Sequence, residues 1–420
     1  MKFSKSSQLF LVSSIGLLVA TLLTACQLVT VDYVFVASSS GSGTNSDGQI
    51  STYAVDSQSG ALRTGAPSVS SGGVNPVALA VTSNYTSLYV ANQTDNTVIH
   101  FAIAANGTLT KKDAVTLSTQ GTTPVSLAVN EANTYLYVVS ASRPGTSGPV
   151  AGGALAAFPI SSDGTIGAAV ANGPLSYWPL SLDTNPNDVL IPTGVIVLAN
   201  NNAVYVSAYD KSAYNPGGTT TSSANPGWVF GFSTASGGAL TAVSGSPYRA
   251  GVKPSGLAAD PTNRFVYVTD FASNDLVGYQ VGTGSTLAFL VNGPFKTGNQ
   301  PSGVTIDPRG KYLYVSNALD STVSAYAIDL PSGTPTTAVS TSGISANSTD
   351  TQPDAIALDP ALGRFVYTAN YLGNSVSGFR LDPNAGSLSP TQATPYPTGA
   401  KPTALVIIPH GNHSLQAVAP

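Results

Sequence analysis

The sequence predicts an all-β fold, a seven-bladed β-propeller made of four-stranded antiparallel blades. A strand-rich unit recurs along the chain at intervals of about 50 residues, the usual length of one blade. Each copy has a small residue at one fixed position, as expected where innermost strands crowd around an axis. The two ends of the chain supply the two halves of the seventh copy, so we expect the N- and C-terminal strands to pair and close the last blade.

Residues 1–25 are expected to be a lipoprotein signal peptide that is cleaved before Cys26. They have a basic start, an apolar run over residues 9–23 and small residues before Cys26, the only cysteine of the chain. A membrane-spanning helix is the weaker alternative, because such a helix needs about 20 apolar residues. An ordinary signal peptide followed by a chance cysteine is the other alternative.

Acylation of Cys26 would anchor the protein to a membrane of the cell envelope. Gln27, and not aspartate, follows the cysteine, which in a cell with two membranes resembles the signal for transport to the outer membrane. We expect residues 26–31 to form a short tether and residues 32–420 to form the propeller.

Each repeat begins at a proline and reaches an aromatic residue in its second strand. The copies at 75–92 and 300–317 read NPVALAVTSNYTSLYVAN and QPSGVTIDPRGKYLYVSN. Alternating β-branched and aromatic residues, bounded by Gly, Asn and Pro, are typical of strands. The repeat prolines are Pro76, Pro124, Pro192, Pro254, Pro301, Pro353 and Pro402, and the aromatic residues are Phe35, Tyr89, Tyr137, Tyr205, Tyr267, Tyr314 and Tyr367.

The seventh copy combines KPTALVIIP at 401–409 with DYVFVAS at 32–38, so Phe35 and Leu405 should lie close together. The small residues favour a closed ring over a linear solenoid, which has no axis to crowd. They stand two positions after each proline and are Ala78, Ser126, Gly194, Gly256, Gly303, Ala355 and Ala404. The Asp-Pro steps are expected to form Asx turns after the innermost strand, at Asp260, Asp307 and Asp359.

Composition excludes several classes of function. Only 9% of the residues are charged and the net charge is −4, so the chain has no basic stripe for nucleic acid. With Cys26 acylated, the mature chain has no thiol for a disulfide or a thiolate metal site. We expect no cofactor and no nucleic-acid partner.

Insertions indicate which face of the propeller carries function. We name the strands of a blade a to d from the axis outward; the b-to-c and d-to-a connections then share one face, which we call the loop-rich face. The long segments assigned to it are 39–49, 141–154, 171–190, 209–228 and 336–351. Loops of this length are usually functional or disordered. The alternative is that these Ser-, Gly- and Thr-rich loops are merely solvated.

The loop-rich face also collects candidate site residues. Those expected to bind a protein, glycan or small-molecule ligand are Arg143, Trp178, Tyr209, Lys211 and Trp228. The weak catalytic candidates are Asp210 and Asp270 as general bases, with Lys253 and Lys401 at the channel mouth as oxyanion partners.

Other polar residues are expected to be structural. The ends of the b strands carry Ser38, Asn92, Ser140, Asp270, Asn317 and Asn370, which suit turns. His410 and His413 have the spacing of a metal pair, but we place them on the opposite, plain face without an acidic or third histidine partner, so no metal site is expected. His100 should be an interior histidine, Glu131 lies in a plain-face turn, and no Ser-His-Asp order with supporting context is evident.

The strings YVAN, YVTD and YVSN at 89, 267 and 314 resemble the Tyr-Val-Thr-Asn repeat propellers of bacterial envelopes. Together with the Pro-x-small and Asp-Pro steps, they are similar to the lactonase family of propellers, which includes 6-phosphogluconolactonase and muconate-lactonising enzymes. The resemblance implies a histidine just before an innermost strand, with arginines and a glutamate around the channel. Here the residues just before the innermost strands include no histidine; they are Asn75, Thr123, Ile191, Lys253, Gln300, Gln352 and Lys401.

Two hypotheses for function follow. The first is a lipid-anchored binding or scaffold module that displays its loop-rich face at the cell envelope. The second is a lactone hydrolase, similar to 6-phosphogluconolactonase, that acts at the channel mouth. A redox enzyme is a weaker third possibility, because the chain has no evident set of cofactor ligands.

Overall fold

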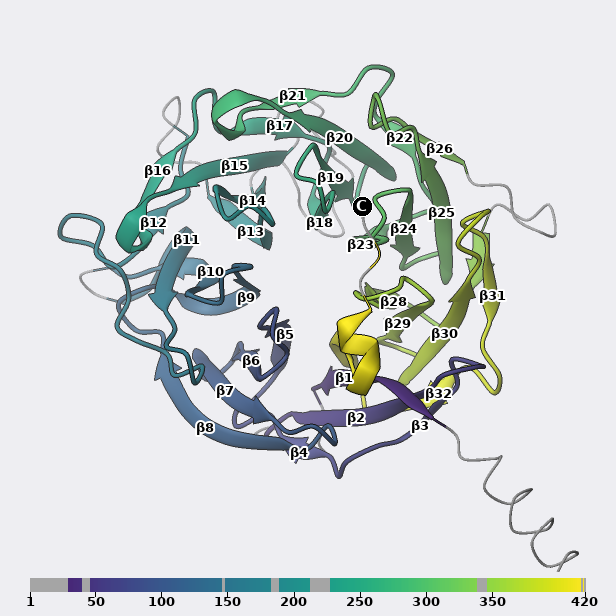
Figure 1. Cartoon of the computed structure of the whole chain (residues 1–420). Coiled ribbons are helices and arrows are strands. Elements are labelled where there is room, and N and C mark those ends of the chain that lie inside the picture. The colour runs from purple at the N-terminus through teal and green to yellow at the C-terminus, as the bar shows by residue number, and fades with distance from the viewer. Residues whose placement is uncertain are drawn as a thin grey trace, which may run out of the picture.

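A computed structural model of the chain describes residues 29–39, 46–145, 148–182, 189–211, 227–337, 346–416 and 418. Seven antiparallel sheets surround a common axis (Figure 1), which confirms the seven-bladed propeller with four-stranded blades. The predicted signal peptide and Cys26 lie outside the described residues. None of the helices in the described part is long and apolar enough to cross a membrane.

Three blades contain the strands up to Pro179, together with the last strand of the chain. In each blade the strands are named in order from the axis outward. The closing blade consists of β33 (Pro402–Pro409), β1 (Thr30–Ser38), β2 (Gln49–Asp56) and β3 (Leu62–Thr64), with β4 (Val69–Ser70) also on β2. The next consists of β5 (Pro76–Val81), β6 (Ser87–Asn92), β7 (Thr97–Ile103) and β8 (Leu109–Thr116). The third consists of β9 (Thr122–Val129), β10 (Tyr135–Arg143), β11 (Val150–Pro159) and β12 (Trp178–Pro179).

The other four blades follow in chain order. The fourth has β13 (Leu190–Val197), β14 (Ala203–Asp210), β15 (Gly227–Thr234), β16 (Leu240–Ala242) and β17 (Tyr248–Ala250). The fifth has β18 (Pro254–Ala259), β19 (Phe265–Asp270), β20 (Asp275–Val281), β21 (Leu287–Phe289) and β22 (Phe295–Lys296). The sixth has β23 (Pro301–Ile306), β24 (Tyr312–Asn317), β25 (Thr322–Ile328), β26 (Pro335–Thr337) and β27 (Ala346–Ser348). The seventh has β28 (Pro353–Leu358), β29 (Phe365–Asn370), β30 (Ser375–Leu381), β31 (Leu388–Pro390) and β32 (Tyr396–Pro397).

Short 3₁₀ helices complete the described elements. They are η1 (Ser236–Gly238), η2 (Thr283–Ser285) and η3 (Gly411–Leu415). The first two lie in connections between the third and fourth strands of a blade, whereas η3 follows the last strand, β33.

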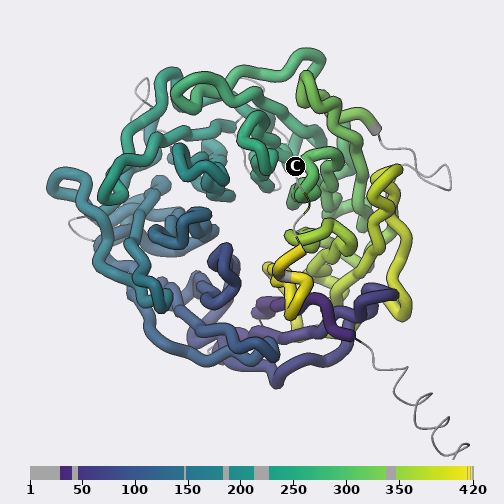
Figure 2. The backbone as a smooth tube through the Cα atoms, in the orientation of Figure 1, coloured from purple at the N-terminus to yellow at the C-terminus, as the bar shows by residue number. Residues whose placement is uncertain are grey.

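The two ends of the chain close the ring as the sequence predicts. Strand β33 pairs antiparallel with β1, with Val406 opposite Phe35 and Leu405 opposite Val36. Figure 2 shows the purple start and the yellow end of the described chain meeting in one blade. The innermost strand therefore comes from the C-terminus and the other strands of this blade from the N-terminus.

Crowding at the axis explains the small residue of each repeat. A Cβ atom added to Gly256 would lie 2.9 Å from the Cα of Gly303 in the next blade. One added to Gly303 would lie 3.2 Å from Cγ2 of Ile356 in the blade after that. Contacts below about 3.4 Å leave little room for a side chain, so neighbouring innermost strands can approach only where the residue is small.

In five of the blades the repeat tyrosine is hydrogen-bonded to the next blade. Tyr267 donates a hydrogen bond from its hydroxyl to the carbonyl of Gly333, 2.6 Å away in the turn between the two outer strands of the following blade. The same bond joins Tyr89 to Gly164, Tyr205 to Ser285, Tyr314 to Gly386 and Tyr367 to Gly60. In the closing blade Phe35 occupies this position and has no hydroxyl to donate.

The aspartates of the Asp-Pro steps cap the turns after the innermost strands, which confirms that interpretation. Oδ1 of Asp307 accepts the backbone N–H groups of Lys311 and Tyr312 at 2.7 and 2.8 Å. Asp260 and Asp359 accept backbone N–H groups in the same turn of their own blades.

Two of the segments that we assigned to d-to-a loops, 171–190 and 336–351, contain part of an outer strand. Strands β26 and β27 both pair with β25, so the chain between them joins two pieces of one outer strand and does not lead directly to the next blade. Likewise β12 pairs with β11, so only the residues after Pro179 connect to the next blade. The prediction was wrong here because the outer strand is interrupted.

Candidate functional site

The seven residues that precede the repeat prolines surround the axis on the loop-rich face, and we call them the axial ring. They are Asn75, Thr123, Ile191, Lys253, Gln300, Gln352 and Lys401. Six of them, all except Ile191, have a positive φ between 52° and 61°. This left-handed conformation costs a non-glycine residue about 1–2 kcal/mol. Backbone strain of this kind is often found where a protein binds ligands.

Asparagines of the b-to-c turns hold the axial ring in this conformation. Oδ1 of Asn274 accepts the backbone N–H of Gln300 in the next blade at 2.8 Å, and Asn374 does the same for Lys401 at 2.8 Å. Asn96 supports Thr123 in this way at 2.6 Å. The ring is therefore built by contacts between blades, and its geometry is fixed without a ligand.

Lys253 of the axial ring and Asp354, two residues after Gln352, interact through their charges, and we call this pair the Lys253–Asp354 centre. Lys253 is partly buried, with Nζ 4.0 Å from the centre of the Phe271 ring. Burial lowers the pKa of Lys253, and the charge of Asp354 opposes this shift. Burial raises the pKa of Asp354, opposed by the amide of Gln352, whose Nε2 lies 3.2 Å from Oδ1, and by Lys253. The pKa of Lys253 is thus lowered and that of Asp354 is raised, and both shifts favour the neutral form of the side chain.

Asp354 was missed by the sequence analysis, although the sequence contains a signal for it. It occupies the position after the repeat proline, where the other blades carry Val77, Val125, Thr193, Ser255, Ser302 and Thr403. In three of these blades the side chain links two blades: Ser302 donates to the carbonyl of Pro353 at 2.5 Å, and Ser255 to that of Pro301 at 2.5 Å. Thr403 does the same to the carbonyl of Pro76 at 2.6 Å. A carboxylate cannot donate such a bond when ionised, so Asp354 departs from a structural pattern.

Lys401, the other lysine of the ring, is exposed. Its Nζ lies 5.9 Å from the centre of the Tyr371 ring, on the b-to-c turn of the seventh blade. Tyr371 in turn donates its backbone N–H to the carbonyl of Gln352 at 2.7 Å. The structure thus places Lys253 and Lys401 in the same ring, as the sequence analysis expected.

The expectation that Asp210 or Asp270 is a general base is not supported. Both residues are fully buried. Burial, and then the charge of Asp275, raise the pKa of Asp270 well above its ordinary value. Asp270 stands where other blades have asparagine, such as Asn317, whose Nδ2 donates to Thr322 and Ser324 within its own blade. We conclude that Asp270 belongs to the interior of its blade.

Among the five predicted ligand-binding residues, Tyr209 pairs with Ile191 of the axial ring, whereas Trp178 is engaged elsewhere. Trp178 is buried, and its indole N–H donates to the carbonyl of Leu240 at 2.9 Å, so it packs two blades together and is not exposed for a ligand. The Trp228 ring has the Arg249 guanidinium 5.8 Å from its centre. Arg143, Tyr209 and Lys211 lie at the loop-side ends of β10 and β14, and their role in binding stays a prediction.

A Ser-His-Asp arrangement, which the sequence analysis did not find, lies on the plain face. Nε2 of His100 is 3.0 Å from Oγ of Ser87, and Nδ1 is 2.6 Å from Oδ1 of Asp113. Ser87 borders a cavity of about 310 Å³. Both Ser87 and His100 are buried, however, and a Cβ on Gly164 would lie 2.2 Å from the serine Oγ.

The same place in other blades explains this arrangement. There an aromatic ring packs beneath the turn glycine, for example Phe265 beneath Gly333 and Tyr312 beneath Gly386. In the second blade the aromatic residue is replaced by Ser87, and His100 from the neighbouring strand fills the space, as an interior histidine should. The arrangement is explained by packing, and nucleophilic catalysis is not needed to account for it.

One expectation for the plain face was wrong. His413 does have acidic neighbours: Asp32 and Asp359 lie 3.6 and 3.5 Å from its ring nitrogens. The three side chains come from segments that are distant in sequence and meet only because the ring closes.

Comparison with known proteins identifies the family to which the chain belongs. A family model described as "Lactonase, 7-bladed beta-propeller" matches residues 33–174 and 241–417. The chain belongs to this lactonase family. No protein with a curated description matches this lactonase-family propeller.

Solved structures similar to this lactonase-family propeller share its fold at low sequence identity. The periplasmic gluconolactonase PpgL of Pseudomonas aeruginosa has a TM-score of 0.70 and 19% identity, over 90% of this chain and 99% of that chain. A putative 6-phosphogluconolactonase of Bacteroides uniformis has a TM-score of 0.68 and 16% identity, over 90% and 99%. A putative 6-phosphogluconolactonase of Bacteroides fragilis has a TM-score of 0.65 and 19% identity, over 90% and 98%.

Proposed function

We propose that the axial ring binds a small hydroxyl-rich lactone and hydrolyses it, in a protein anchored to the cell envelope through Cys26. The observation that carries this proposal is the Lys253–Asp354 centre, in which two partly buried groups of opposite charge are shifted in opposite directions. Titratable groups perturbed in this way are typical of functional sites. The lactonase family and the periplasmic gluconolactonase among the similar structures support a lactone as the substrate class.

The residues of the ring can carry out lactone opening. Asp354 accepts a proton from a water molecule, which attacks the lactone carbonyl carbon. The ammonium group of Lys253 stabilises the negative charge that develops on the carbonyl oxygen. The bond from the carbonyl carbon to the ring oxygen then breaks, and Asp354 returns the proton to that oxygen. One lactone and one water thus give one hydroxy acid. The amides of Gln300 and Gln352 bind hydroxyl groups of the substrate.

Binding without turnover is the second candidate. It is favoured by the composition of the axial ring, which has amides and lysines but no histidine. A ring of this composition can hold a polar small molecule, or a glycan or protein group, for a scaffold or sensor at the envelope. The lipid anchor and the location are part of both candidates.

The two candidates are separated by measuring turnover and binding on the same preparations. Glucono-δ-lactone and 6-phosphogluconolactone are offered to the wild type, Asp354→Asn and Lys253→Met, with acid release followed at constant pH. Loss of general-base catalysis predicts a decrease of roughly 10²–10⁴-fold in kcat/KM for Asp354→Asn. Ser87→Ala is the matched control and should retain activity.

Calorimetric titration with gluconate and with each lactone completes the test. Binding that Lys253→Met weakens, without any turnover by the wild type, would support the binding module over the hydrolase. Turnover that is lost in Ser87→Ala and retained in Asp354→Asn would move the reaction to the plain face and refute the proposal.

A further inference from the structure

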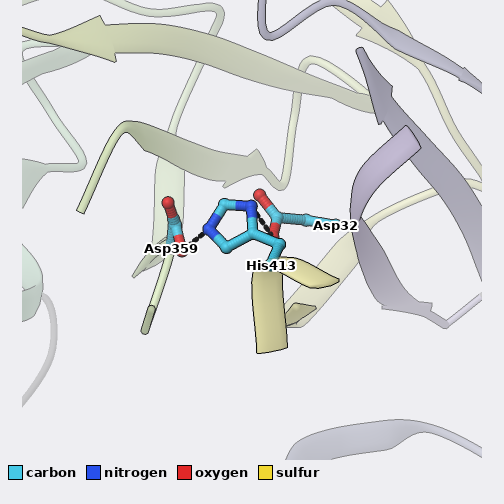
Figure 3. Close-up of side chains that lie close together, drawn as sticks. All are labelled: Asp32, Asp359 and His413. Carbon is cyan, nitrogen blue, oxygen red and sulfur yellow. Dashed lines mark ion pairs between the residues drawn. The ribbon is translucent and has the colours of Figure 1, made fainter. Parts of the chain in front are cut away.

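Three titratable side chains meet where the chain ends are joined to the seventh blade (Figure 3). Asp32 lies in β1 of the closing blade, Asp359 in the turn between β28 and β29, and His413 in η3. Nδ1 of His413 is 3.6 Å from Oδ1 of Asp32, and Nε2 is 3.5 Å from Oδ1 of Asp359. All three are buried, and the two aspartates have no exposed surface. The group therefore bridges both termini and the neighbouring blade.

The burial of the Asp32 carboxylate requires an explanation. Among the described residues, neither of its oxygens has a hydrogen-bond partner. Asp359 differs, because it accepts the backbone N–H groups of Ala361 and Arg364 at 2.9 and 3.1 Å. An ionised carboxylate that is buried without a partner is strongly unfavourable, so it takes up a proton or is paired with a cation.

The geometry favours a proton over a metal ion. A metal ion binds one nitrogen of an imidazole ring, because the lone pair of neutral histidine is on one nitrogen only. Here each of the two ring nitrogens faces a different carboxylate, as the labelled side chains show (Figure 3). Protonated histidine carries an N–H on both nitrogens and matches this arrangement.

We propose that Asp32, His413 and Asp359 form a proton-binding latch, which holds the C-terminal segment and the closing blade to the seventh blade and weakens when it loses protons. The latch is distinct from the axial ring, since it lies on the plain face. It adds an electrostatic link to a closure that also depends on the pairing of β33 with β1 and on the hydrogen bond from Tyr367 to Gly60.

The surrounding charges agree with proton uptake. Burial, and then the charge of Asp359, raise the pKa of Asp32 to about 8. Burial lowers the pKa of His413, but the closeness of Asp359 and the charges of the two aspartates outweigh this and raise it. Burial raises the pKa of Asp359, but the closeness of His413 and the hydrogen bonds from the turn outweigh this and lower it. The other titratable or charged groups facing the latch are Arg364, Tyr85 and Tyr367, while His410 packs on Tyr33 with ring centres 4.9 Å apart.

The direction of the pH dependence follows from these shifts. Asp32 and His413 have folded-state pKa values above their unfolded values, so their contribution is present at low pH and is lost as the pH rises towards about 8. Asp359 has a lowered pKa, so its contribution is present above the unfolded value and is lost only in acid. The latch is therefore strongest in mildly acidic solution and weakest in alkaline solution.

Asparagine at position 32 tests this inference, because it has the shape of the protonated aspartate but does not titrate. The melting temperature of the full chain in mild detergent is compared at pH 5.5 and pH 9 for the wild type, Asp32→Asn, His413→Gln and the control His410→Gln. We expect Asp32→Asn to melt slightly higher than the wild type at pH 5.5, which is already above the unfolded pKa of aspartate, and to exceed it by a few degrees more at pH 9. His413→Gln should lower the melting temperature more at pH 5.5 than at pH 9, and His410→Gln should show no such difference.

Hydrogen exchange of the peptide that spans residues 410–416 reports the latch locally. In the wild type this peptide should exchange faster at pH 9 than at pH 5.5, after correction for the intrinsic rate, and Asp32→Asn should remove the difference. A constant difference between Asp32→Asn and the wild type at both pH values would overturn the proposal. So would a melting temperature that falls with EDTA and is restored by zinc at both pH values, because that result would assign the site to a metal ion.

Discussion

Replacement of Gly256 by alanine tests whether crowding at the axis selects the small residue of each repeat. The new methyl group would lie 2.9 Å from the Cα of Gly303 and 3.0 Å from the backbone nitrogen of Val304. Both contacts are with backbone of the next blade, which cannot rotate away. Overpacking of this kind costs about 1–3 kcal/mol. Stiffening of the unfolded chain offsets about 0.4–1 kcal/mol, which leaves a net loss of about 1–2 kcal/mol.

Gly194 is the matched control, because it occupies the same position in the fourth blade. A methyl group there would lie 3.1 Å from the Ser207 hydroxyl, which can rotate, and 3.6 Å from Cβ of Leu257. We expect Gly194→Ala, although buried, to stay within about 0.5 kcal/mol of the wild type, because the hydroxyl rotates away and stiffening of the unfolded chain offsets the remaining crowding.

Urea unfolding followed by tryptophan fluorescence gives the comparison. With an m value near 3 kcal/mol/M, a loss of about 1–2 kcal/mol lowers the midpoint by about 0.3–0.7 M. The m value itself should not change. Equal midpoints for Gly256→Ala and Gly194→Ala would refute the reasoning, because the two sites differ only in what the added methyl group meets.

Three further predictions concern single side chains. Tyr267→Phe leaves the buried carbonyl of Gly333 without its donor, so urea unfolding should show a loss of about 1–2 kcal/mol; an unchanged midpoint would mean that the bond between blades contributes nothing. Asp270→Asn removes a group whose folded-state pKa is raised, so the variant should gain stability relative to the wild type as the pH rises from 5 to 8, measured by thermal unfolding, and a constant difference would contradict this. Cys26→Ser should move the protein from the membrane fraction to the soluble fraction, and its retention in membranes would argue against lipidation.

The fold was predictable because the signal is repeated. The prolines recur because each marks the start of an innermost strand, and the small residues recur because the axis is crowded. The tyrosines recur because they form the hydrogen bond to the next blade. Even the closeness of Phe35 to Leu405, which pairs with the adjacent Val36, followed from completing the seventh copy. A constraint that acts seven times is visible in one sequence.

The site was less predictable because its residues depart from the repeat and do not follow it. Asp354 differs from the six residues at the same position, but a single departure is visible only once the register of the blades is known. Asp270 was misjudged because a polar residue at the end of a strand looks the same whether it faces the axis or the interior of the blade. His413 meets Asp32 and Asp359 only through ring closure and the path of η3, which no local pattern records.

The closing blade also sets an order of events during the biogenesis of the protein. Strand β1 is among the first parts of the propeller to be synthesised, while its inner partner β33 is among the last. Until β33 arrives, β1 has an open hydrogen-bonding edge, the kind of edge that pairs with other chains and leads to aggregation. A nascent or truncated chain that ends before Pro402 therefore keeps this edge of β1 unpaired.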